Sequence, residues 1–176
     1  MEFCVKIICM LKHNFDEYFQ YYEKLVENMK LLDALVVINE RTKTIVDNIE
    51  VSGDYKYAHN KWSVKQLLCH LIDAERIFCN RALRFARNDN TDLPGYNHDE
   101  YVQFDNSSNR TVSDILTEYQ SVRHSSICLF QSFTDDMLSK SGMANGNLLS
   151  VKSIGKIIAG HEKHHINILT EKYLNQ

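Results

Sequence analysis

The segment GHEKHHINIL, residues 160–169, places three of the chain's eight histidines within five residues. It lies in a helical pattern whose buried stripe is continued by positions 161, 164 and 165, since residues three or four apart share a helix face. His164 and His165 are about 100° apart around a helix. A metal-binding pair would therefore be His161 with His165 or His161 with His164, and the periodicity does not choose between them. The apolar residues that define the stripe are Ile154, Ile157, Ile158, Ile168 and Leu169.

The composition favours one soluble, mainly helical domain. The 176 residues are 44% hydrophobic and 24% charged, and one proline and six glycines are few for a turn-rich sheet fold. A net charge of −3 gives no basic surface for nucleic acid or an anionic membrane, so neither is expected as a partner. The five cysteines are scattered without a C-x-x-C pair, which favours reduced thiols and a cytoplasmic location.

Helical periodicity predicts an all-α fold, an antiparallel four-helix bundle with a long crossover loop. Residues 1–28 are expected to form an N-terminal extension in which FDEYFQYYEKLVEN is a short helix, and residues 29–176 to form the bundle. The first residues, MEFCVKIICMLKH, are a poor signal peptide and too short to span a bilayer. The four long helices are expected at about residues 29–49, 63–87, 111–133 and 150–174, with the crossover loop at 88–110.

Two helix starts have capping chemistry in the sequence. Ser63 and Gln66 fit a capping box at the start of the second long helix. Thr111 is a suitable N-cap for the third, with Asp114 in its first turn.

The second long helix offers a partner for the histidine cluster. His70 lies on the face of Leu67, Ala74 and Ile77. One histidine from this helix and a pair from the last would give three convergent imidazoles, which suits a catalytic Zn²⁺ site with an open coordination position, or a site for a related divalent ion. The alternative is three unrelated polar core residues that bond to backbone or water.

The same segment also contains the H-E-x-x-H pattern, His161-Glu162-Lys163-His164-His165. In metalloproteases of this type the glutamate acts as general base. Their third ligand usually lies downstream, whereas only eleven residues follow His165, and no strand that could align a peptide is evident. We therefore do not favour a protease.

From about residue 55 onward the chain resembles the DinB/YfiT-like family. The segments that carry the resemblance occur in the family's order and spacing; they are KWSVKQLLCHLIDAERIFCNRALRFARND, LPGYNHDEYV, ILTEYQSVRHSS and IIAGHEKHH. The resemblance implies a four-helix bundle, often a homodimer, that binds a divalent metal, zinc or nickel, through one histidine of the second helix and an H-x-x-x-H pair of the last. Those positions here are His70, His161 and His165.

The resemblance leaves the reaction open. The expected function is a metal-dependent thiol S-transferase that joins a low-molecular-weight thiol to a small electrophile, because a bound metal lowers the pKa of a thiol. The alternatives are a metal-dependent hydrolase that uses a metal-bound hydroxide, and a non-catalytic bundle that binds metal or a partner.

Other residues near these motifs have weaker assignments. Asp73 could orient a ligand imidazole or be a solvated carboxylate, Glu162 is expected to pair with another helix rather than act as a base, and His164 is an outer neighbour of the metal site or an ordinary polar residue. In the long loop, Tyr96, His98 and Asp99 could roof the metal and touch substrate. Four further residues, expected to serve only in packing, are Tyr55, Tyr57, Trp62 and Cys69.

Overall fold

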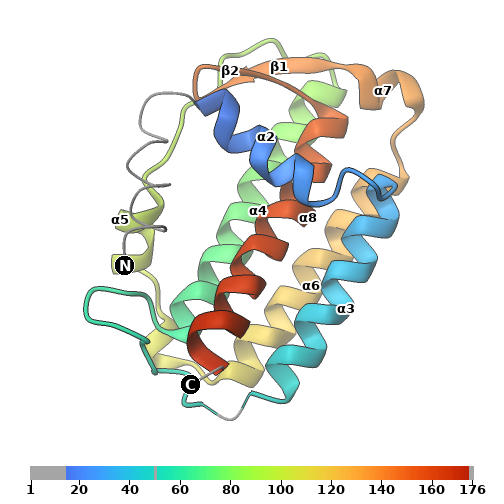
Figure 1. The fold of residues 1–176 in the computed structure, drawn as a ribbon. Helices are drawn as coiled ribbons and strands as arrows, with labels where there is room; N and C mark the ends of the chain where they lie inside the picture. The colour runs from blue at the N-terminus through green and yellow to red at the C-terminus, as the bar shows by residue number, and fades with distance from the viewer. Residues whose placement is uncertain (1–14, 50, 175–176) are drawn as a thin grey trace.

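A computed structural model describes residues 15–49 and 51–174 of the chain (Figure 1). Four long helices are joined by shorter helices and one β-hairpin. In chain order the elements are α2 (Phe15–Leu25), α3 (Leu31–Asp47), α4 (Val64–Ala86), α5 (His98–Gln103), a 3₁₀ turn (Ser107–Asn109), α6 (Val112–Gln131), α7 (Asp135–Ser139), β1 (Ser141–Ala144), β2 (Asn147–Ser150), α8 (Val151–Ile168) and a π-helical segment (Leu169–Leu174).

The predicted four-helix bundle with a long crossover loop is confirmed. Helix α4 packs against α6 and α8, and α3 packs against the same two helices. The crossover, which includes α5, returns the chain along the bundle, so α4 and α6 run in the same direction and α3 and α8 run in the opposite one (Figure 1). The two helices that hold the candidate metal ligands, α4 and α8, are therefore antiparallel neighbours.

The predicted helix starts agree with the structure. At α4 the Ser63 hydroxyl accepts from the Gln66 backbone N–H at 3.2 Å, and the Gln66 side chain accepts from the Ser63 N–H at 2.9 Å. Thr111 and Asp114 form the same reciprocal pair at α6. Each box satisfies two backbone donors that a helix start leaves free, which fixes where these helices begin.

The hairpin β1–β2 is not part of the sequence prediction, which had a loop between the third and fourth long helices. Its turn is Asn145-Gly146, with φ of 52° and 74°, the left-handed conformations that a tight two-residue hairpin turn needs. Leu93 of the crossover bonds to this hairpin at both backbone groups, donating to the Met143 carbonyl at 2.9 Å and accepting from the Asn145 N–H at 2.8 Å. These two bonds hold the crossover against the hairpin, which leads directly into α8.

Helix α2 crosses α8 at very short range. An added Cβ on Gly160 would lie 2.0 Å from the backbone carbonyl oxygen of Tyr22, so only glycine permits this approach. Phe19 and Tyr22 are buried in the contact. Within the bounds expected for the N-terminal extension, this helix thus packs on the bundle beside the histidine cluster, and residues 1–14 lie outside the described part of the chain.

The core consists of two apolar clusters along the bundle axis. One joins α2, α3 and the hairpin to the later half of α4, and the other joins the first half of α4 to α6 and the end of α8. Cys69 is buried in the second cluster, as expected, and the cysteines that the structure describes are free. Within the described residues no helix has the length and apolar character that a membrane span requires.

Candidate metal centre

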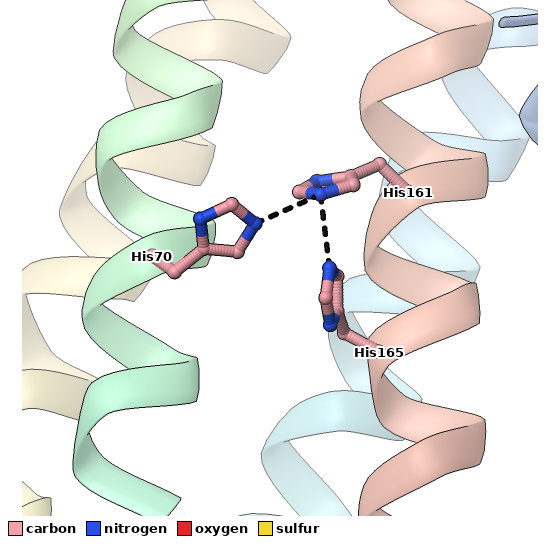
Figure 2. A group of neighbouring side chains, drawn as sticks. All are labelled: His70, His161 and His165. Atoms are coloured by element: carbon pink, nitrogen blue, oxygen red, sulfur yellow. Dashed lines mark hydrogen bonds between the residues drawn. The ribbon is translucent and has the colours of Figure 1, made fainter. Parts of the chain in front are cut away.

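Three imidazoles meet between α4 and α8 (Figure 2). The Nε2 atom of His161 lies 3.0 Å from Nε2 of His70 and 3.0 Å from Nε2 of His165. One nitrogen from each of the three rings lies within 4.8 Å of the others, so small movements would bring all three to the 2.0–2.1 Å of a zinc–nitrogen bond. The described residues contain no other such group of three histidines, cysteines or acids.

The structure distinguishes between the two pairs that the helical pattern left open. His165 joins His161 in the cluster, whereas the ring of His164 turns toward α2, where its Nδ1 lies 3.1 Å from the hydroxyl of Tyr21. His161 and His165 are one turn apart and project to the same side of α8, as residues at i and i+4 do.

Hydrogen bonding alone does not satisfy these three rings. A ring nitrogen carries either one N–H or one in-plane lone pair. The His161 Nε2 atom therefore cannot make a good hydrogen bond to both of its neighbours. A cation that accepts one lone pair from each ring would satisfy all three, so the donor set fits a divalent metal.

Burial keeps the imidazoles in the form that binds metal. His70 and His161 are 7% and 6% exposed. Burial lowers the pKa of His70 to about 3, and the nearby His98 and His164 act in the same direction. Burial likewise holds the pKa of His161 and of His165 well below the usual value, with the neighbouring histidines adding to the effect. Neutral nitrogens carry free lone pairs, so no proton has to leave before a metal binds near pH 7.

The triad opens onto a cavity of about 480 Å³. Helices α2, α4 and α8 contribute to its walls, and nine of its 21 lining residues are phenylalanine, tyrosine or tryptophan. Trp62 lies against the triad, with its ring centre 4.7 Å from that of His70 and 6.3 Å from that of His165. Trp62 directly precedes the N-cap of α4, where packing is expected of it, and there its ring packs beside two candidate ligands. Tyr55 and Tyr57 pack on Tyr173, and Tyr57 also borders the cavity.

The three loop residues singled out in the sequence all reach this cavity. Tyr96, His98 and Asp99 border it, at and just before the start of α5. The His98 ring centre is 5.6 Å from that of His70 and 5.9 Å from that of Trp62, so His98 is a fourth histidine over the triad. The Asp99 carboxylate is 3.9 Å from His98 Nε2 and is 68% exposed, which places it at the rim.

Asp73 takes no part in the cluster. Its carboxylate lies 4.0 Å from the Arg76 guanidinium and is 39% exposed. Arg76 in turn pairs with Glu118 of α6 at 2.7 Å. Of the two interpretations of Asp73, the surface carboxylate fits this position.

Glu162 points away from the cavity, into the bundle. It pairs with Arg123 of α6 at 2.6 Å and accepts hydrogen bonds from Tyr119 and Thr42. The Arg123 guanidinium also donates to both carboxylate oxygens of Glu75, at 2.8 and 2.7 Å. Glu162 thus pairs with other helices and is not available as the base of an H-E-x-x-H protease.

This ion network lies between the two apolar clusters, and the sequence did not reveal it. Arg123 is 1% exposed, and its partners come from α3, α4 and α8. The sequence does not distinguish a buried arginine from an exposed one. Only the position of Arg123 on the buried face of α6 could have indicated its burial. Arg81, which also borders the cavity, was missed for the same reason.

The comparisons agree with this fold. The sequence matches the DinB superfamily over residues 15–169, so the chain belongs to that family, as the resemblance implied. YfiT from Bacillus subtilis, described as a probable metal-dependent hydrolase with an unusual four-helix bundle topology, is similar in structure. The TM-score is 0.70 at 19% sequence identity, over 81% of this chain and 83% of YfiT. No curated protein matches the sequence.

Proposed function

We propose that this protein is a metal-dependent hydrolase of a small organic substrate. His70, His161 and His165 would hold a divalent ion, and an all-nitrogen donor set suits zinc or nickel. The observation that carries the proposal is the position of the triad in the wall of a 480 Å³ cavity, because a site closed by four protein ligands would leave no place for a substrate. The description of YfiT as a probable metal-dependent hydrolase supports the same choice.

The cavity residues have separate roles in this proposal. The ion would lower the pKa of a coordinated water, which makes a nucleophile near neutral pH. The ring of His98 stands beside His70 and can take up or return a proton. Trp62 covers one side of the triad and limits the access of bulk water.

Thiol S-transfer is the second candidate, and the position of Glu162 favours it. No carboxylate belongs to the histidine cluster within the described residues, and Glu162 is held by Arg123. A thiol that has lost its proton to solvent on binding the ion needs no protein base. The aromatic cavity could accept the electrophile.

One set of assays separates these functions. Purified protein without an affinity nickel step should contain about one zinc or nickel ion per chain by elemental analysis. His161→Ala should lose the ion, and His164→Ala, its matched control on the same helix, should keep it. The wild-type protein should cleave p-nitrophenyl esters without any thiol, and His161→Ala should not.

The other outcomes are equally informative. Metal-dependent conjugation of a thiol to 1-chloro-2,4-dinitrobenzene without ester cleavage would replace the hydrolase with the transferase. A protein that holds metal but has neither activity would favour a binding role. Absence of metal from the wild-type protein, after refolding with zinc or nickel, would refute the metal centre.

The homodimer expected from the sequence stays a prediction. Val36 and Val37 of α3 are 43% and 52% exposed and provide apolar surface on one side of the bundle. Light scattering should give about twice the 20.5 kDa chain mass. A mass near 20 kDa at high concentration would refute it.

A further inference from the structure

Arg81 is a buried cation that no carboxylate of the described residues neutralises. It is 4% exposed on α4, and its one hydrogen bond to the residues that the structure describes runs from Nη2 to the Pro94 carbonyl at 2.9 Å. Within the described part of the chain no carboxylate lies within 4.0 Å of it, whereas four other arginines have one. Those four are Arg76, Arg84, Arg110 and Arg123.

The contacts that Arg81 makes with the described residues do not neutralise its positive charge. A guanidinium has five N–H donors, and a neutral carbonyl uses one of them. The face of Phe78, 5.6 Å from the Arg81 Cζ atom, adds only a weak attraction. Burial lowers the pKa of Arg81, which is the effect of a charge removed from water without compensation. A buried charge usually has a partner, and here the open side is the cavity.

The guanidinium is also held in a fixed orientation. Its acceptor, the Pro94 carbonyl, follows Leu93, which is bonded to Met143 and Asn145 of the hairpin. The loop cannot move without breaking those bonds. The remaining donors are therefore preoriented, and Tyr96 borders the same cavity.

Arg81 and the histidine triad lie at two ends of one site. Eleven residues separate His70 from Arg81 on α4, which is three turns, about 16 Å and only about 20° of rotation. Both residues border the cavity, and Phe78 contacts both Arg81 and His161. An elongated ligand could therefore place one group at the triad and another at Arg81.

We propose that Arg81 binds the carboxylate of the substrate, remote from the reacting group at the triad. The planar fork of a guanidinium matches a carboxylate with two parallel hydrogen bonds. The aromatic lining between the two ends fits an apolar carbon chain or ring. This inference rests on the proposed function for the reacting group, but the carboxylate site itself needs no metal.

The test measures carboxylate binding in chelator-treated, full-length protein, so that the probe cannot coordinate a metal. Calorimetry compares hexanoate with hexanamide, which has the same shape and no charge. Hexanoate should bind the wild-type protein more tightly, on the order of tenfold or more, as expected for a charge-assisted pair. Arg81→Gln should abolish the preference. Arg87→Gln, an exposed arginine at the end of the same helix, should keep it.

Two further variants keep the test decisive. Arg81→Lys retains the charge without the fork; it should weaken hexanoate binding while leaving hexanamide unchanged, even if Arg81→Gln does not fold. Lys61→Gln removes the other cation that borders the cavity and should have little effect. Equal affinities in the wild-type protein, no hexanoate binding, or loss of the preference in Lys61→Gln instead would overturn the proposal. Failure of the metal assays would not change these results.

Discussion

The contact between Gly160 and Tyr22 gives a substitution for which helix propensity and the structure predict effects of opposite sign on stability. On propensity alone, Gly160→Ala should stabilise a buried helix by about 1 kcal/mol. In the structure the new Cβ would meet a backbone oxygen at 2.0 Å, about 1 Å inside the shortest contact that a real Cβ makes. Helix α2 must therefore move away from α8.

The cost follows from what α2 buries. If the contact relaxes in place, overpacking costs about 1–3 kcal/mol, which equals or exceeds the gain in propensity. If α2 detaches, the burial of Phe19 and Tyr22 is lost as well, at about 1.5–3 kcal/mol for each side chain. With mid-range values and the propensity gain subtracted, we expect a net destabilisation of about 1 kcal/mol if the contact relaxes in place and about 3.5 kcal/mol if α2 detaches.

Urea unfolding followed by far-ultraviolet circular dichroism measures this change. Gly155→Ala is the matched control on α8, because its new Cβ would meet side-chain atoms of Leu31 and Phe130, at 2.7 and 2.8 Å, rather than backbone. Side chains can rotate, so its cost should be smaller. A Gly160→Ala protein as stable as the wild type, or more stable, would refute the close packing of α2 on α8.

Three further predictions concern charge and protonation. Arg123→Met should destabilise the fold by about 3–5 kcal/mol in thermal or urea unfolding, because it leaves two buried carboxylates without a cation. Glu162→Gln should cost less, and the reverse order would contradict the network. In chelator-treated protein the folded state holds His70 neutral, with a pKa of about 3, whereas the unfolded chain gains a proton below about pH 6.5. The contribution of these neutral rings to the free energy of unfolding should therefore be fully present above pH 7. It should fall by up to about 1.4 kcal/mol per pH unit for each triad histidine as the pH drops toward 5. An unchanged urea midpoint at pH 5.5 would argue against buried neutral rings. Iodoacetamide at pH 8 should label exposed Cys128 well before Cys69, whose pKa burial raises to about 11, as mass spectrometry of tryptic peptides would show; equal labelling would contradict the burial of Cys69.

Local signals in the sequence predicted the helices well and the hairpin poorly. The helix starts at Ser63 and Thr111 have side chains that satisfy backbone donors nearby, so neighbouring residues suffice to predict them. The Asn145-Gly146 dipeptide is an equally local hairpin signal. Its two strands, however, have only four residues each, too few to show the alternation of apolar and polar residues that marks a longer strand. Pairing with Leu93 of the crossover loop also helps to hold them.

The candidate site could be predicted only where its residues have distinctive chemistry. His70, His161 and His165 stood out because histidine is uncommon on an apolar helix face, and the family resemblance selected the pair on α8. Arg81 and Arg123 have no such distinguishing feature in the sequence. Their roles depend on which residues lie opposite them, from segments as much as 88 residues away, and this is a property of the tertiary packing.

Two adjacent residues of α8, about 100° apart around the helix, face different parts of the molecule. His161 faces the cavity, and Glu162 faces the ion network, so adjacent residues belong to the candidate metal centre and to the buried ion network. Loss or gain of a single residue in α8 before this point would rotate the following turns by about 100°. The carboxylate would then turn away from Arg123, and the histidines would turn away from His70. We therefore expect the spacing between Ser150 and His165 to stay fixed in length among homologous chains.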